Sequence, residues 1–186
     1  MTAIEKYFVN SPGHTRTVDS HALQLLARID YQSGWRYLDV GCGIGTAARQ
    51  IAATTDMSVT AVDVDPKQIA IAKSAAPGSR VDYRVMDATK LEFADGQFNV
   101  TAAQMATHHI PHWERAFAEM VRVLRYGGYL IYRDFAFPWW LAKVVRRLPS
   151  TRAIDQLARD AGLVRIYASR QYGKQDSIWL KPDRVG

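Results

Sequence analysis

A glycine-rich loop, Gly41 to Gly45, is the segment of this sequence best suited to hold a ligand. It follows a short apolar stretch and precedes a segment with helical periodicity. Alternating glycines permit a tight turn and let a ligand approach the backbone closely, and free N–H groups at a helix start bind acceptor groups. Asp39 lies just before the loop, separated from it by Val40, where its carboxylate can reach a positively charged amine. The loop therefore predicts a binding site.

Two further acids follow the next two predicted strands. Asp63 ends the second strand and is placed to accept hydrogen bonds from ribose hydroxyls. Asp87 follows the third strand, where a carboxylate and a nearby backbone N–H can read the exocyclic amine and a ring nitrogen of adenine. Ligands of open α/β sheets bind outside the carboxyl ends of the strands. The three acids together predict a ligand with an amine, a ribose and a purine.

Two other nucleotide-binding patterns do not fit the loop. A dinucleotide fingerprint, G-x-G-x-x-G, would need its third glycine at Thr46, one position after Gly45. A phosphate-binding P-loop would need G-K-[ST] after the loop, which the sequence lacks.

The loop sits in an alternation of short apolar runs and helical-period segments, which predicts a parallel sheet of βαβ units in one domain spanning 1–186. Predicted strands are 36–40, 59–62, 81–86, 98–103, 129–135, 164–169 and 177–181. Predicted helices are 17–30, 46–55, 67–75, 112–124 and 151–161.

The charge is uneven along the chain. The net charge is +6, and this excess lies in residues 143–186, which carry 10 Lys and Arg against 4 Asp and Glu. A basic excess attracts phosphates, anionic lipid or acidic substrates, and a solvated basic face is the simpler interpretation. One cysteine excludes a disulfide framework, and the sequence has neither a membrane span nor a signal-peptide pattern. We therefore expect a soluble, cytoplasmic protein.

Four segments carry a family resemblance: LDVGCGIGT, AVDVD, VMDATKLEFADGQFNV and HHIPHWERAFAEMVRVLRYGGYLIYRDF. The chain resembles a class I S-adenosylmethionine-dependent methyltransferase, in the branch of small-molecule and quinone-biosynthesis enzymes, over about residues 20–182. The resemblance implies a Rossmann-like, doubly wound α/β sheet of seven strands. Its order is 3-2-1-4-5-7-6, the seventh strand is antiparallel, and helices cover both faces.

The resemblance also implies roles for residues around S-adenosylmethionine and its product S-adenosylhomocysteine. The methionine moiety would face Asp39, Gly41, Cys42, Gly43 and Gly45, with Gln104 nearby. The ribose would face Asp63 with Val64 beside it, and the adenine would face Met86, Asp87 and Ala88. Two positions depart from the family pattern: Asn99 replaces the usual Asp, and Tyr126 replaces the usual Pro before Gly-Gly. We expect both to affect local packing more than the cofactor.

Two segments are candidates for covering the site. In the family the N-terminal segment, here 1–34, often covers the cofactor, and Tyr7, Phe8 or His14 would then contact the sulfonium or the acceptor or simply anchor the terminus. Residues 136–150 are the candidate substrate lid, with Trp139 and Trp140. The basic amphipathic stretch 139–148 either makes weak contact with a membrane surface or is a core helix.

Methyl transfer from a sulfonium is an in-line displacement, so the protein mainly holds the acceptor close and excludes water. A general base is needed only when the acceptor must lose a proton. His108 and His109 follow the fourth strand and are the candidate catalytic bases, unless they only brace the loop. Asp134 and Arg133 either line the acceptor pocket or form surface pairs. Cys42 is not expected to act as a nucleophile.

The sequence therefore predicts methyl transfer to a small, lipophilic or aromatic acceptor, by a monomer or homodimer without a metal. One alternative is an RNA or protein methyltransferase, although no N-P-P-Y-type motif or nucleic-acid module accompanies the basic region. The other is a non-catalytic protein of the same fold that binds the cofactor or a partner.

Overall fold

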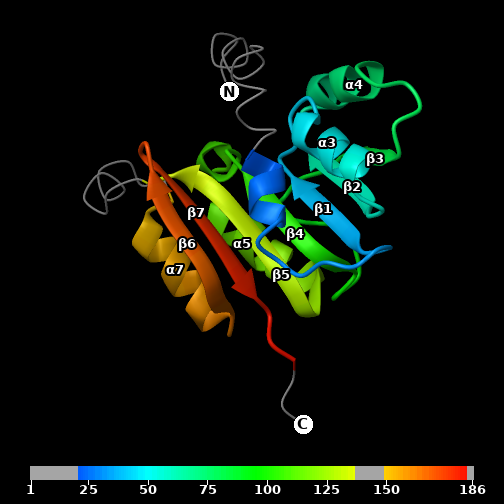
Figure 1. The fold of residues 1–186 in the computed structure, drawn as a ribbon. Coiled ribbons are helices and arrows are strands. Elements are labelled where there is room, and N and C mark those ends of the chain that lie inside the picture. The colour runs from blue at the N-terminus through cyan, green and yellow to red at the C-terminus, as the bar shows by residue number, and fades with distance from the viewer. Residues whose placement is uncertain (1–20, 137–148, 184–186) are drawn as a thin grey trace.

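The computed structural model describes residues 21–136 and 149–183. Its centre is a seven-stranded sheet with helices on both faces (Figure 1). The strands are β1 (Arg36–Val40), β2 (Ser58–Asp63), β3 (Val81–Val85), β4 (Phe98–Gln104), β5 (Leu124–Phe135), β6 (Val164–Gln171) and β7 (Lys174–Leu180). The helices are 21–26, α3 (Thr46–Thr54), α4 (Pro66–Ser74), the short 3₁₀ helix η1 (Thr107–His109), α5 (Trp113–Val123) and α7 (Thr151–Asp160).

The strand order is β3-β2-β1-β4-β5-β7-β6, as the family resemblance implied. Strands β1 to β5 pair in parallel, and β7 pairs antiparallel with both β5 and β6. The carboxyl ends of five parallel strands therefore lie at one edge of the sheet, and the ligand site was predicted at this edge.

Two predicted strand boundaries were wrong. Strand β5 begins at Leu124, directly after α5, because Leu124 pairs with Phe98 before the glycine pair, whereas the sequence predicted a start at residue 129. Strand β7 begins at Lys174 because a tight hairpin joins it to β6, whereas the prediction began at residue 177. The hairpin turns at Tyr172, which has a φ of 52°. A positive φ is uncommon in tyrosine, so the residue type did not predict a turn at this position.

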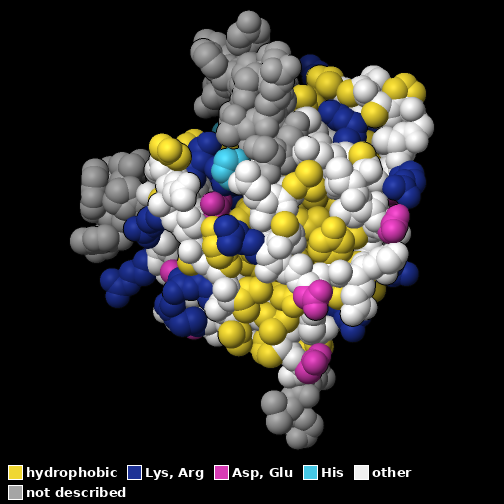
Figure 2. All heavy atoms as spheres, in the orientation of Figure 1, with side chains coloured by type: hydrophobic (Ala, Val, Ile, Leu, Met, Phe, Trp, Pro, Cys, Tyr) yellow, Lys and Arg dark blue, Asp and Glu magenta, His cyan; other side chains and the backbone are white. Residues whose placement is uncertain are grey.

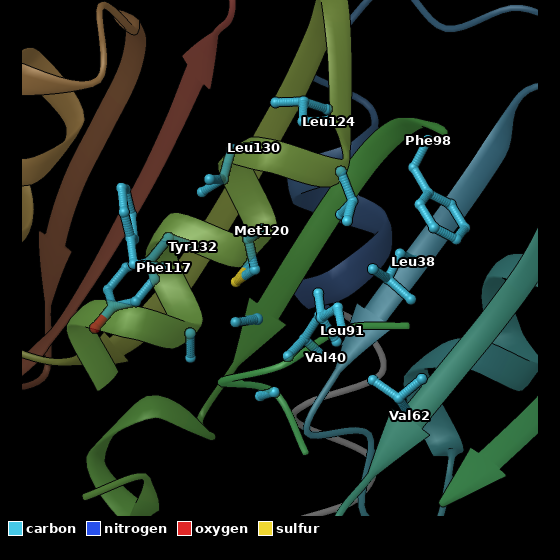
Figure 3. Packing of buried hydrophobic residues seen from close by; sticks show 14 of the residues in the cluster. Leu38, Val40, Val62, Leu91, Phe98, Phe117, Met120, Leu124, Leu130 and Tyr132 are labelled. Carbon is cyan, nitrogen blue, oxygen red and sulfur yellow. The ribbon is translucent and has the colours of Figure 1, made fainter. Parts of the chain in front are cut away.

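Each face of the sheet has its own hydrophobic core. On one face, α5 and α7 pack over β1, β4 and β5, and Figure 3 shows Phe117 and Met120 of α5 facing Leu130 and Tyr132 of β5. On the other face, helix 21–26, α3 and α4 pack over β1 and β2. The strands of a sheet buried on both faces read as nearly continuous apolar runs. That is why β4 is buried at every position.

The two departures from the family pattern both have local structural roles. Asn99 is buried, and its Oδ1 accepts a hydrogen bond from the backbone N–H of Arg36 at 3.0 Å, which an aspartate in its place would also accept. Tyr126 lies under the Lys181 ammonium, with Nζ 4.7 Å from the ring centroid. The same ammonium donates hydrogen bonds to the carbonyls of Val121 and Leu124.

Arg122 of α5 anchors the loop that leads from Asp87 to β4. Its guanidinium donates to the Leu91 and Phe93 carbonyls, each at 2.8 Å, and to the Asp95 carboxylate at 2.7 Å. Glu119 accepts two bonds from Arg122 and one from the Leu91 backbone N–H. The hydrogen bonds that Arg122 donates to Glu119 and Asp95 raise the pKa of Arg122, and the bond to Glu119 lowers the pKa of that carboxyl.

No helix in the described residues is long and apolar enough to cross a bilayer.

Arg122→Met should lower the free energy of unfolding by about 2–3 kcal/mol, because it leaves two carbonyls and the Glu119 carboxylate without their donor. Chemical denaturation measures the change. Arg125→Met is the matched control, since among the described residues the exposed Arg125 side chain bonds only the carbonyl of the next residue, and it should change stability by less than about 0.5 kcal/mol. Equal effects of the two substitutions would contradict the anchoring role.

Candidate functional site

A pocket of about 440 Å³ lies at the carboxyl ends of β1 to β4. Eight residues singled out from the sequence line it: Gly41, Gly43, Asp63, Val64, Met86, Asp87, Ala88 and His109. They come from four separate segments of the chain, which the parallel strands bring to one edge. The pocket therefore brings together most of the residues that were predicted to bind the cofactor, and one of the two candidate catalytic histidines.

The loop between β1 and α3 approaches its neighbours too closely for side chains at two of its glycines. A Cβ on Gly41 would lie 2.5 Å from the Ala106 Cβ, and one on Gly45 would lie 2.5 Å from the Tyr83 ring. Both glycines also have positive φ. A Cβ on Gly43 would meet nothing within 4 Å, so at Gly43 the backbone is open on its pocket side. The loop is thus packed at both ends and open in the middle.

Asp63 joins this loop to the end of β2. One carboxylate oxygen, Oδ2, accepts a hydrogen bond from the Gly43 backbone N–H at 2.8 Å. The other, Oδ1, accepts from the Asp65 backbone N–H at 2.9 Å. Each oxygen keeps acceptor capacity beyond these bonds. The carboxylate therefore has a fixed orientation on the pocket wall and can accept further hydrogen bonds.

Asp39 and Gln104 lie within the sheet and do not line this pocket. Asp39 is 3% exposed, and burial, followed by the charge of Asp63, raises its pKa to about 7. Gln104 is also buried, on the same face of the sheet two positions beyond the residue that pairs with Asp39. Both were predicted near the methionine moiety, and in the structure both are buried outside the pocket lining.

Asp87 and Met86 form the wall opposite the glycine loop. The exposed Asp87 carboxylate accepts hydrogen bonds from the Thr89 backbone N–H and hydroxyl, each at 2.8 Å. Met86 is buried, and its sulfur accepts the Glu92 backbone N–H. The Asp87 carboxylate gives this wall a polar edge, and the Met86 side chain and the Ala88 methyl group give it an apolar surface. Such a wall suits a flat ring with hydrogen-bonding groups at its edge.

Cys42 lies in the loop without lining the pocket. Burial raises the pKa of its thiol, and the charges of Asp39 and Asp63 raise it further. A thiol held in its protonated form is a poor nucleophile, which agrees with the expectation from the sequence. Gly45 likewise lies outside the pocket lining, as the residue before α3.

The two adjacent histidines have different surroundings. His109 is exposed and lines the pocket. The His108 Nδ1 lies 2.6 Å from the Asp134 Oδ1, and the ring centroids of the two histidines are 3.9 Å apart. The sequence left two roles open for these histidines, a catalytic base or a brace for the loop. In the short helix η1, the His109 ring lies at the pocket, and the His108 ring is hydrogen-bonded to a carboxylate.

Asp134 and Arg133 do not form the surface pairs that the sequence suggested. Asp134 is fully buried, so its carboxylate does not reach the described pocket. Arg133 is 6% exposed, and its Nη1 donates to Asp176 of β7 at 2.8 Å. Successive residues of a strand point to opposite faces. Two neighbours in the sequence therefore have separate buried partners.

Sequence reasoning missed half of the pocket lining: Asp65, Gln68, Thr89, Met105, Ala106, Ile110, Pro111 and His112. Gln68 is 7% exposed, and its buried Oε1 has no hydrogen-bond partner among the described residues. A buried polar atom of this kind needs a partner, which a ligand or a water can supply. The position of Gln68 in the first turn of α4, a few residues after Asp63, was the one feature of the sequence that could have indicated a place in the pocket. Met105 adopts a positive φ of 55° at the end of β4, and no residue-type signal predicts this in a methionine.

Four predicted contact residues, Tyr7, His14, Trp139 and Trp140, lie outside the described residues, as does Phe8. The same holds for residues 1–20 of the proposed N-terminal cover, and for residues 137–148, which include most of the proposed lid and of the basic stretch 139–148. In the described ranges, no group of three or more His, Cys, Asp or Glu is arranged to hold a metal ion.

Basic side chains gather away from the pocket. Figure 2 shows Lys and Arg side chains over β6 and α7, at the edge of the sheet opposite β3. Arg165 of β6 donates to Asp155 of α7 at 2.9 Å, which neutralises part of this charge. The described part of the basic C-terminal region thus lies at an exposed sheet edge.

Comparison with families of known proteins gives a match over about half of the chain. The methyltransferase domain family matches residues 38–132, from β1 to β5. Among curated proteins, the 27-O-demethylrifamycin SV methyltransferase of Amycolatopsis mediterranei is 35% identical over 116 residues, covering 60% of this chain and 43% of that protein. The chain spans about two fifths of the length of the curated relatives that it matches.

Two solved structures show the same fold. A chain from the complex between the Trm112 methyltransferase activator and a methyltransferase of Haloferax volcanii has a TM-score of 0.78 at 17% identity, covering 96% of this chain and 98% of its own. Phosphoethanolamine N-methyltransferase 2 of Haemonchus contortus, in complex with phosphomonomethylethanolamine and S-adenosylhomocysteine, has a TM-score of 0.73 at 19% identity, covering 88% and 53%. The glycine loop, Asp63 and Asp87 all fall within the family match. The chain belongs to the methyltransferase domain family and has the fold of the class I S-adenosylmethionine-dependent methyltransferases.

Proposed function

We propose that this chain binds S-adenosylmethionine at the carboxyl ends of β1 to β4 and transfers its methyl group to a small, lipophilic or aromatic acceptor. The observation that carries the proposal is the Asp63 carboxylate. It is fixed by the Gly43 N–H on the wall of a pocket large enough for a nucleoside. Such a carboxylate accepts hydrogen bonds from ribose hydroxyls.

The residues present fit each part of this cofactor. Asp63 holds the ribose, and Asp87 with Met86 and Ala88 holds the adenine. Gln68 also lines the pocket, and its buried Oε1 has no hydrogen-bond partner among the described residues. We assign the methionine ammonium to Asp39, a buried carboxylate at the end of β1 that does not itself line the described pocket. When bound, the cofactor supplies a methyl group already activated by the sulfonium charge, so the protein's work is to orient the acceptor and exclude water.

A small-molecule acceptor is supported by the relatives and by the pocket wall. The relatives are named for a rifamycin and for phosphoethanolamine. Met105, Ile110 and Pro111 give the acceptor side of the pocket an apolar lining, which favours a lipophilic or aromatic molecule. Cytoplasmic location, a monomer or homodimer, and weak membrane contact through 139–148 stay predictions.

The two alternative functions have distinct signatures. RNA or protein methylation would use the basic edge at β6 and α7, and its affinity would fall steeply with salt. A non-catalytic partner protein would bind the cofactor without turnover, and one fold neighbour comes from a complex with an activator protein. Methyl transfer to a small acceptor at undiminished rate in high salt separates the proposal from both.

Asp63→Ala should weaken S-adenosylmethionine binding by roughly 10-fold or more, because about 1.5–3 kcal/mol of charged hydrogen bonding is lost. Calorimetric titration of the wild type with S-adenosylmethionine, and in parallel with NADH, should show binding of the first alone. Asp56→Ala is the control, since Asp56 is an exposed carboxylate outside the pocket. Unchanged affinity in Asp63→Ala, or tight NADH binding, would overturn the assignment.

Gly43→Ala and Gly34→Ala form a matched pair. Both glycines have positive φ, and a Cβ would meet nothing within 4 Å at either. Each substitution should therefore cost a similar backbone strain, about 1–2 kcal/mol of stability. Only Gly43 lines the pocket, so only Gly43→Ala should weaken cofactor binding, by roughly 10-fold or more if the ligand lies against the backbone there. Equal affinities would show that the ligand lies elsewhere.

Binding at Asp39 should release a proton at mildly acidic pH. Burial raises the pKa of Asp39 to about 7 in the folded chain, whereas an unfolded aspartate ionises near pH 3.9. Protonated Asp39 therefore stabilises the folded state below about pH 4, and this contribution is lost as the pH rises to about 7. A bound ammonium favours the ionised carboxylate, so cofactor affinity should rise between about pH 6 and pH 8.

Calorimetry at about pH 6 in two buffers of different ionisation enthalpy measures the released proton. The wild type should show different apparent binding enthalpies in the two buffers, and Asp39→Asn should show a much smaller difference. Identical enthalpies for the wild type would mean that Asp39 does not meet the cationic group.

A further inference from the structure

A buried hydrogen-bonded chain links β5 to η1 beside the pocket. It consists of Tyr132, Thr107, Asp134 and His108. The Thr107 hydroxyl donates to the Asp134 carboxylate and lies 2.8 Å from the Tyr132 hydroxyl. A hydroxyl has a single proton, and Thr107 uses its proton in the hydrogen bond to Asp134. Thr107 therefore accepts the hydrogen bond from the Tyr132 hydroxyl. At the other end, the His108 Nδ1 lies 2.6 Å from the Asp134 Oδ1.

Asp134 accepts from four directions. Besides Thr107 and the His108 ring, it accepts the backbone N–H of His108 at 3.1 Å and that of Phe135 at 2.8 Å. An ionised carboxylate accepts in this way and has no proton to give. The His108 Nδ1 must therefore be the donor in its bond with Asp134. In the neutral ring this places the lone pair on Nε2, on the opposite side of the imidazole.

The His108 ring lies next to the pocket wall. Its centroid is 3.9 Å from that of His109, which lines the pocket, and 4.9 Å from that of Phe135. Its side chain is 13% exposed, and within the described residues no hydrogen bond to Nε2 is present. The buried Asp134 carboxylate thus holds the His108 ring after the end of β4, where the acceptor is expected. Among the described residues, the basic Nε2 of that ring has no hydrogen-bond partner.

We propose that His108 is the general base of the reaction, that Asp134 with Thr107 and Tyr132 are its positioning residues, and that the acceptor is a phenol or enol. This rests on the proposed function. As the acceptor oxygen forms its bond to the methyl carbon, the carbon–sulfur bond breaks and its electron pair stays on sulfur. The acceptor proton moves to the His108 Nε2. Asp134 stabilises the resulting imidazolium, which later returns its proton to water.

The tautomer can be measured on the full chain without any acceptor. Nitrogen-15 NMR of the histidine rings should show His108 protonated at Nδ1, with slow exchange of that proton. Thr107→Val removes the hydroxyl at nearly constant volume, and should weaken this protection and mix the tautomers. Thr107→Ser keeps the hydroxyl and should preserve the wild-type spectrum. An Nε2–H tautomer in the wild type would overturn the proposal.

Kinetics with two acceptors separate a base from a merely structural histidine. The probes are a simple phenol and a nitrophenol already ionised at mildly alkaline pH, with S-adenosylhomocysteine formation as the readout. His108→Gln should lower kcat/KM roughly 10²-fold or more for the phenol, because general-base catalysis is lost. The rate with the ionised nitrophenol should change by less than about 3-fold, because it has no proton to lose.

The positioning residues are tested in the same assay. Thr107→Val should lower the phenol rate by roughly 10-fold, a fraction of the general-base contribution, and Thr107→Ser should restore it. S-adenosylmethionine affinity should be unchanged in both variants, because neither Thr107 nor His108 lines the cofactor pocket.

Each contrary outcome has a separate meaning. Equal losses for the two acceptors in His108→Gln, or a loss of stability alone, would overturn the base assignment. Transfer to amines or thiols without transfer to any phenol would overturn this inference and leave the proposed function standing. Absence of S-adenosylmethionine binding would instead overturn the proposed function itself.

Discussion

The hydrogen bond from the Gly43 N–H to the Asp63 carboxylate is the interaction on which the site depends. It ties the loop after β1 to the end of β2, so that the two segments form one wall of the pocket. Gly41 and Gly45 permit this bond because their missing side chains leave room for Ala106 and Tyr83. The second contact of the Asp63 carboxylate is with the backbone N–H of Asp65, the N-cap residue of α4, and it ties the start of that helix to the pocket wall.

The same arrangement places two carboxylates close together in a partly buried region. Asp39 is buried, and the charge of Asp63 adds to the effect of burial on its pKa. An uncompensated buried charge is costly, so a cationic ligand is the natural complement to this pair. The proposed cofactor has its ammonium at that end and its ribose at Asp63, which gives both acids a role in one ligand.

Strand β5 serves two separate networks through the alternation of its side chains. On one face Arg133 pairs with Asp176 of β7, and on the other Asp134 binds His108 and Thr107. The antiparallel β7 supplies the partner for the first network, and the turn after β4 supplies partners for the second. The end of β5 is thus fixed from both sides, next to the region that we assign to the acceptor.

The sequence by itself determined the fold class, the strand order through its family resemblance, and the half of the pocket that comes from the glycine loop, Asp63 and Asp87. These follow from local signals, because a glycine turn or an acid at a strand end keeps its position relative to its own strand. Only the tertiary structure decided that Asp134 binds His108, that Gln68 and Met105 line the pocket, and that Arg122 anchors the loop from Asp87 to β4. Partners such as Asp134 and His108 are 26 residues apart. Their contact depends on strand register and on a left-handed turn at Met105, and neither is encoded in the periodicity of a single segment.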